Sequence, residues 1–197
     1  MNVITELDDL YSFFSENQDL FNKRKNRPGG NSYGDQLKVL KDVFDISFPY
    51  GYCFPLSQFV FYYLGGYDSE FDLRCIRDIE LPVEGYDFKT THWFVQSKDK
   101  QIVIDLSKSQ FDKIVDIEEY YSKARRANFG AKFITIDSER IRFNRFVPSI
   151  QTRNLYKAYR ENFSPLPISN VLEFSYLLEQ GKVNVDTPRE SVMQVEL

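Results

Sequence analysis

The sequence predicts an α+β fold in which helices pack on a small antiparallel sheet. Three observations lead to this expectation: an apolar helix that carries a cysteine at its start (residues 50–66), a pair of alternating strands (89–106), and two amphipathic segments toward the C-terminus (152–163 and 169–178). The 197 residues are 42% hydrophobic and 16% aromatic, which is enough to bury one aromatic-rich core.

Residues 50–66 have the pattern of a buried helix. Pro55 suits the first helical turn, where its missing N–H would be unpaired in any case, and Gly65 with Gly66 supplies a left-handed stop. Nearly all side chains between these signals are apolar, so the helix must be covered on every side.

Cys53 lies where this helix begins. Unpaired N–H groups and the positive end of the helix dipole converge there, and this position favours thiolate over thiol. The alternative is that Cys53 packs as a small hydrophobe, as buried free cysteines commonly do. Cys75 falls inside a predicted strand (73–79), away from any helix start, and we interpret it as structural.

Residues 89–106 are predicted to form a hairpin around a polar turn at 97–100. With that turn, His92, the only histidine, lies opposite Asp105, close enough for the carboxylate to accept a hydrogen bond from the imidazole. A shift of one residue would destroy this pairing. The other face then presents a continuous apolar surface made of Trp93, Val95, Ile102, Ile104 and Leu106.

Cys53, His92 and Asp105 together predict a catalytic triad. Cys53 would attack, His92 would pair with the thiolate and move the proton, and Asp105 would hold the tautomer and orientation of the ring. Each residue alone also has a structural interpretation: a packed cysteine, a satisfied strand histidine and a turn residue at a strand end.

This order of residues resembles the transglutaminase-like branch of the papain-like cysteine hydrolases, in particular small bacterial or phage members. The resemblance lies within residues 50–111, in the segments Tyr-Gly-Tyr-Cys-Phe-Pro-Leu-Ser, Thr-His-Trp-Phe-Val and Ile-Val-Ile-Asp-Leu-Ser-Lys-Ser-Gln-Phe. It implies a papain-like or transglutaminase-like core, acyl transfer at a peptide, isopeptide or side-chain amide bond, and no cofactor. Protease, amidase, deamidase and transfer activities stay open, because a fold does not choose among them.

The glutamine that papain-type enzymes place shortly before the nucleophile is missing between residues 41 and 52. Backbone N–H groups at Cys53 and its neighbours are therefore candidate oxyanion donors. Candidate side-chain contacts to the oxyanion or the substrate are Tyr50, Tyr52, Gln36, Gln110 and Trp93. The tyrosines have an equally good interpretation as packing residues. The loop at 82–87 is a candidate wall of the substrate site.

We expect a single domain over 1–197, with its core at about 31–136, a helical appendage at 150–182 and a tail at 183–197. Further predicted elements are helices at 5–22, 35–44 and 117–126, and strands at 73–79 and 132–136.

Composition narrows the choice of partners. The net charge of −4 and the absence of an aromatic platform argue against nucleic acid, although the basic stretches 23–27 and 125–126 keep it as the weakest hypothesis. The sequence has no metal-ligand spacing, membrane-length apolar run or secretory signal, and only two cysteines. We therefore expect a cytoplasmic protein with no metal and no membrane contact, and we leave its oligomeric state open.

Two functions remain after these observations. The first is a cysteine hydrolase that acts on a protein or peptide-like substrate. The second is a non-catalytic binding or inhibitory protein on a papain-like fold. A degenerate member of the family should have lost a catalytic residue, and the presence of all three candidates favours the enzyme.

Overall fold

The computed structural model describes residues 3–20, 48–85, 87–127, 131–136, 139–144, 148–162, 172–173, 176–177, 180 and 193–195. The helices are α1 (Val3–Glu16), α3 (Cys53–Tyr63), α4 (Glu118–Tyr121) and α5 (Ile150–Asn162), with short 3-10 helices at Gln18–Leu20, Gly66–Asp68 and Lys108–Phe111. The strands are β1 (Phe71–Leu81), β2 (Phe88–Ser97), β3 (Val103–Ile104), β4 (Arg125–Arg126), β5 (Ala131–Ile136), β6 (Glu139–Asn144) and β7 (Met193–Val195).

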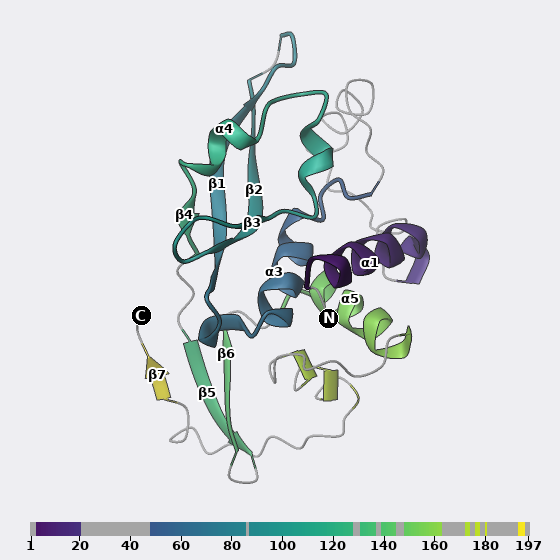
Figure 1. Ribbon diagram of the computed structural model, residues 1–197, viewed down its shortest axis with the longest axis vertical. Helices are drawn as coiled ribbons and strands as arrows, with labels where there is room; N and C mark the ends of the chain where they lie inside the picture. Colours follow the sequence, from purple (N-terminus) through teal and green to yellow (C-terminus); the bar gives the residue numbers. More distant parts are fainter. Residues whose placement is uncertain are drawn as a thin grey trace.

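The strands form two antiparallel sheets, one with the order β3-β2-β1-β4 and one with the order β6-β5-β7 (Figure 1). The predicted α+β class is confirmed. Helix α3 lies beside the larger sheet, and helices α1 and α5 pack against α3 (Figure 1). One core joins these helices to β1 and β2 through side chains such as Leu10, Phe59, Leu73, Val95 and Leu155.

Helix α3 is buried because it is apolar nearly all round. Every residue from Pro55 to Tyr62 is buried, and Gly65 ends the helix in the left-handed region with φ +105°. Phe59 packs edge-on against Phe14 of α1 and against Tyr159 of α5, with ring centroids 5.3 and 5.8 Å apart. The predicted buried helix and its stop signal are thus present.

Helix α5 is tied to α3 by a buried polar contact. The side-chain oxygen of Gln58 accepts hydrogen bonds from the Thr152 hydroxyl at 2.7 Å and from the Ser149 N–H at 3.0 Å. Ser149 also accepts the Thr152 N–H, which satisfies one of the unpaired donors at the start of α5. The first helix of the predicted appendage therefore shares the core of α3.

The hairpin register differs from the prediction by two residues. Gln96 lies opposite Val103, not Gln101, because the loop spans 98–101 and the Ser97 hydroxyl accepts the Ile102 N–H at 2.9 Å. Asp99 shapes this loop by accepting the Gln101 N–H at 3.0 Å. Side chains alternate along a strand with period two, so a shift of two residues keeps every side chain on its predicted face.

Other predictions about the elements need correction. The helix expected at 117–126 is shorter than predicted and consists of α4 alone. The last two residues of the predicted range form strand β4 instead, and Arg126 makes an ion pair there with buried Asp72. The expected tail contributes β7, which pairs with β5. Strand β6 was not predicted. The helix at 35–44 and the basic stretch at 23–27 fall outside the described residues, as does most of the helix at 169–178.

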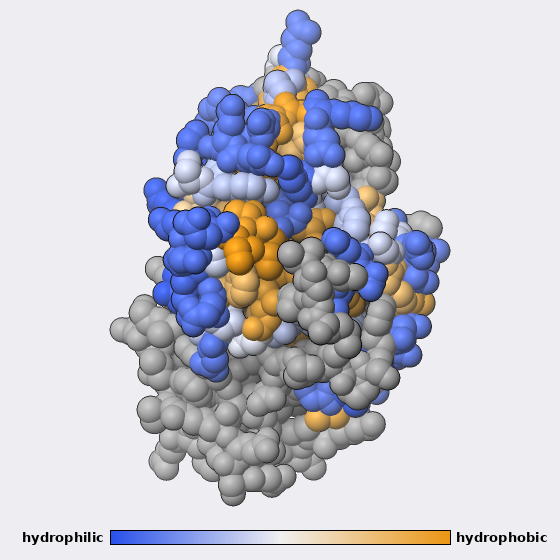
Figure 2. Space-filling view, in the orientation of Figure 1, coloured by the Kyte–Doolittle hydropathy of each residue, from blue (hydrophilic) through white to orange (hydrophobic). Residues whose placement is uncertain are grey.

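One face of the molecule carries an apolar patch over β3 (Figure 2). Ile102, expected on the core-facing side of the hairpin, is 52% exposed, and Val103 is 37% exposed. That expectation was wrong for Ile102, because β3 is only two residues long and Ile102 precedes it. In the part of the chain that the structure describes, no helix has both the length and the apolar character needed to cross a bilayer.

Candidate active site

Cys53 is the first residue of α3 and is partly exposed. It lines a pocket of about 130 Å³ that lies between the start of this helix, strand β2 and the segment after Asp105. The other lining residues are Tyr50, Gly51, Leu81, Thr90, Thr91, Gln110, Phe111 and Ile114. The thiol donates a long hydrogen bond to the Thr91 carbonyl at 3.9 Å.

The surroundings of the sulfur keep it protonated. Burial raises the pKa of the Cys53 thiol to about 11, although the backbone N–H groups of Trp93 and Phe54 act in the opposite direction. The charge of Asp105 adds to the increase. The expectation that the helix start favours thiolate is thus wrong, because desolvation of the sulfur outweighs these backbone donors. At neutral pH Cys53 is a thiol.

His92 and Asp105 form a buried pair. The His92 side chain is 0% exposed and that of Asp105 is 3% exposed, and the distance from Nε2 to Oδ2 is 2.6 Å. An ionised carboxylate can only accept, so Nε2 carries the proton and donates it. In the neutral ring Nδ1 is then an acceptor, and the Nε2 of Gln110 lies 3.3 Å from it. This is the tautomer that a general base at Nδ1 requires.

Asp105 receives two further partners on its carboxylate. Tyr121 of α4 donates its hydroxyl to Oδ2 at 2.8 Å. Ser107 donates both its N–H and its hydroxyl to Oδ1, each at 3.1 Å. The Ser107 contact is the local turn that an Asp commonly makes two residues onward, so the sequence contained a signal for it. No local pattern marks Tyr121, which is 16 residues away in the chain.

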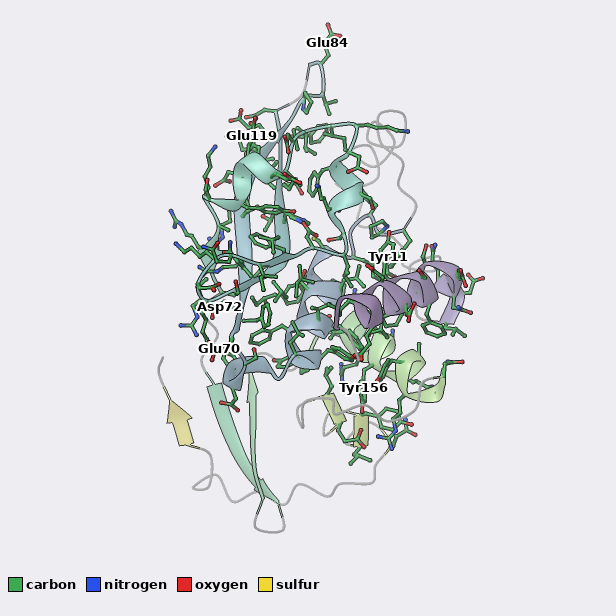
Figure 3. All side chains as sticks on the ribbon, in the orientation of Figure 1. Tyr11, Glu70, Asp72, Glu84, Glu119 and Tyr156 are labelled. Atoms are coloured by element: carbon green, nitrogen blue, oxygen red, sulfur yellow. The ribbon has the colours of Figure 1, made fainter. Side chains whose placement is uncertain are left out.

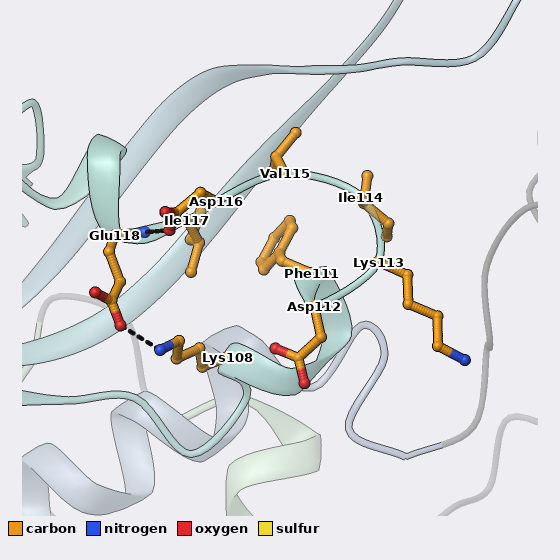
Figure 4. A pocket seen from close by; sticks show the side chains of 9 residues that line it. All are labelled: Lys108, Phe111, Asp112, Lys113, Ile114, Val115, Asp116, Ile117 and Glu118. Carbon is orange, nitrogen blue, oxygen red and sulfur yellow. Dashed lines mark hydrogen bonds and ion pairs between the residues drawn. The ribbon is translucent and has the colours of Figure 1, made fainter.

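Gln110 links the turn before Cys53 to the histidine. Its amide donates to the Ser107 carbonyl at 2.9 Å and lies against His92, while its oxygen accepts the Gly51 N–H at 3.4 Å. Gln110 belongs to the 3-10 helix Lys108–Phe111. The segment after this helix, residues 112–117, curves around the Phe111 ring (Figure 4). An ion pair between Lys108 and Glu118 joins the two ends of that segment (Figure 4).

The remaining predicted contacts have different places. Tyr50 lines the pocket, whereas Tyr52 is 3% exposed and packs against Phe48 in the core. Trp93 makes an edge-to-face ring contact with Phe54, with centroids 4.8 Å apart, and its backbone N–H contacts the Cys53 sulfur. Gln36 lies outside the described residues.

A shallow groove of about 880 Å³ adjoins the pocket and shares Leu81 and Ile114 with it. Described residues of the loop at 82–87, expected to form a wall of the substrate site, line this groove. Glu84 lies at the far tip of the β1–β2 hairpin, and its side chain points away from the body (Figure 3).

Two absences concern the described residues. No hydrogen bond joins the Cys53 sulfur to the His92 ring there, and no group of three or more His, Cys, Asp or Glu side chains in that part of the chain has a metal-binding arrangement. Cys75 is buried in β1 opposite Trp93, and burial raises the pKa of its thiol.

Comparison with protein-family models, with curated proteins and with solved structures finds no match for this chain.

Proposed function

We propose that this chain is a cysteine-dependent acyl-transfer enzyme, a hydrolase of peptide, isopeptide or side-chain amide bonds, with a papain-like or transglutaminase-like core. The observation that carries the proposal is the buried pair of His92 and Asp105. The other ring nitrogen of His92, Nδ1, lies against Gln110, and Gln110 and Cys53 line the same pocket. A general base needs an oriented imidazole with an acceptor nitrogen, and the contact with Asp105 supports both.

The proposed reaction starts from a neutral thiol and a neutral imidazole. The Cys53 sulfur attacks the carbonyl carbon of the amide, and its proton passes to His92 Nδ1. The imidazolium, held by Asp105, then gives this proton to the leaving nitrogen as the C–N bond breaks, which leaves a thioester on Cys53. Water attacks the thioester while His92 accepts a proton from the water. The imidazolium then returns this proton to the Cys53 sulfur as the C–S bond breaks, which yields the carboxylic acid and the free thiol.

Gln110 has a defined part in this scheme. Its amide contacts Nδ1 in the structure, so it must move aside before the thiol can transfer a proton to that nitrogen. The same movement breaks the hydrogen bond that the Gly51 N–H donates to the Gln110 oxygen. We propose that the substrate carbonyl replaces the Gln110 carboxamide there and that the Gly51 N–H, with the N–H of Cys53 at the helix start, binds the oxyanion.

A second function is favoured by a specific observation. The raised pKa of the Cys53 thiol, and the lack of a hydrogen bond between it and His92 among the described residues, suit a non-catalytic binding or inhibitory protein that keeps the same side chains for packing.

Alkylation of Cys53 by iodoacetamide, followed by mass spectrometry from pH 6 to 11, distinguishes these functions. With a pKa of about 11, only about one Cys53 in 10⁴ is thiolate at pH 7. If His92 accepts the proton during attack, we expect a rate at pH 7 at least about tenfold above the rate which that thiolate fraction allows. Cys75, buried in the same chain, serves as the internal reference.

A rate that simply follows the thiolate fraction up to pH 11 would contradict the enzyme proposal and favour the binding protein. Cys53→Ala assigns the labelled peptide, and alkylation in denaturant gives the intrinsic rates of both cysteines.

A further inference from the structure

We infer that Tyr121 is a positioning residue for the proposed base: it holds the Asp105 carboxylate in the orientation that fixes the His92 tautomer. This inference rests on the proposed function, and it adds a fourth residue to Cys53, His92 and Asp105. The juxtaposition that carries it is the Tyr121 hydroxyl on the same carboxylate oxygen, Oδ2, that His92 Nε2 contacts.

The carboxylate of Asp105 is saturated by its donors. Oδ2 accepts from His92 and from Tyr121, and Oδ1 accepts twice from Ser107. Two oxygens offer about four lone-pair positions, and all four are used. Because the Ser107 donors and the Tyr121 hydroxyl hold opposite oxygens, the carboxylate cannot rotate without breaking at least one of these contacts.

Tyr121 is itself placed by packing. Its ring lies 4.7 Å from the ring of Phe94 in β2, and the Phe94 ring is stacked at 6.3 Å on the imidazole of His92. The aromatic column therefore runs from Tyr121 through Phe94 to His92, while the hydroxyl and the imidazole meet on Asp105. A phenylalanine at position 121 would keep the ring contact with Phe94 and lose the hydrogen bond to Asp105.

The phenol remains a donor at every physiological pH. Burial, first of all, and the neighbouring Asp105 raise the pKa of Tyr121 well above its usual range, and the acids Glu118 and Asp116 add to the increase. The hydroxyl therefore always carries its proton toward the carboxylate.

The neighbouring Tyr120 provides a matched control. Both tyrosines belong to α4, but the ring of Tyr120 faces the Lys123 ammonium, 4.7 Å from the ring centroid, and lines the shallow groove. Tyr120→Phe removes a hydroxyl from the same short helix without touching Asp105.

The test uses the full chain with ¹⁵N-labelled histidine. Because His92 is the only histidine, its two ring nitrogens give the only imidazole signals, and their shifts report the tautomer directly. In the wild type at a pH where the ring is neutral, we expect one tautomer with the proton on Nε2. In Tyr121→Phe we expect both shifts to move toward a mixture of tautomers, and in Tyr120→Phe we expect no change. The alkylation rate of Cys53 should fall roughly fivefold in Tyr121→Phe.

Unchanged histidine signals in Tyr121→Phe, or equal changes in both variants, would overturn the inference. If Tyr121→Phe does not fold, Tyr121→Met removes the same hydroxyl and takes its place. The histidine signals do not depend on Cys53, so they test Tyr121 even if alkylation proves independent of His92. Alkylation that is independent of His92 would refute the proposed function, but it would not refute the coupling of Tyr121 to His92.

Discussion

Asp105→Asn is expected to lower the rate of Cys53 alkylation at pH 7 by at least about tenfold, back to the rate that the thiolate fraction alone allows. The amide of asparagine can donate to Nε2, which makes Nε2 the acceptor and moves the proton to Nδ1. His92 then presents an N–H where the thiol needs a lone pair. The rate is measured by mass spectrometry of the native protein, and His92→Gln defines the lower limit.

Asp99→Asn is the matched control for this variant. Asp99 lies in the β2–β3 loop and accepts hydrogen bonds from Ser97 and Gln101, without contact to His92. We expect it to change hairpin stability slightly and to leave the rate unchanged. If Asp105→Asn alkylates as fast as the wild type, the His92–Asp105 pair is a packing feature and the proposed base is wrong.

Phe59→Ala is expected to lower the free energy of unfolding by about 3–5 kcal/mol, a large part of the stability of an ordinary domain. Phe59 is fully buried in α3 and contacts Phe14 of α1 and Tyr159 of α5, so the cavity would open where three helices meet. Urea unfolding followed by far-UV circular dichroism measures the change. If the chain is one domain, the transition should stay single and move to lower urea.

Ile150→Ala serves as the control, since Ile150 begins α5 but is 56% exposed. It should change the unfolding free energy by less than about 1 kcal/mol. Two separate transitions in Phe59→Ala, with one unchanged from the wild type, would show that the helices and the sheet unfold independently and would contradict the single-domain prediction.

Local signals explain why much of the fold can be predicted. The apolar run of α3 between Pro55 and Gly65 leaves no exposed face, and the alternation of β2 places His92 and Phe94 on one side of the strand. The exact register could not be predicted, because it depends on how Ser97 and Asp99 close the loop. The error was harmless to the site, since a shift by two residues preserves the face on which Asp105 lies.

Elements that depend on distant partners were harder to predict. Residues 125–126 continue the helical pattern of α4 in sequence, yet they pair with β1, and Arg126 contacts Asp72, more than 50 residues earlier. Strand β7 exists only by pairing with β5. Backbone pairing of this kind has no local periodicity, so a pattern along the chain does not indicate it.

The sequence by itself determined that a cysteine would begin a buried helix and that the only histidine would share a strand face with Asp105, because both follow from periodicities of the backbone. The tertiary structure alone decided the chemical state of that cysteine and the partners of that carboxylate. Desolvation of the Cys53 sulfur, the reach of Tyr121 and the bridge made by Gln110 depend on which segments pack together in space, and these contacts join residues that have no regular separation along the chain.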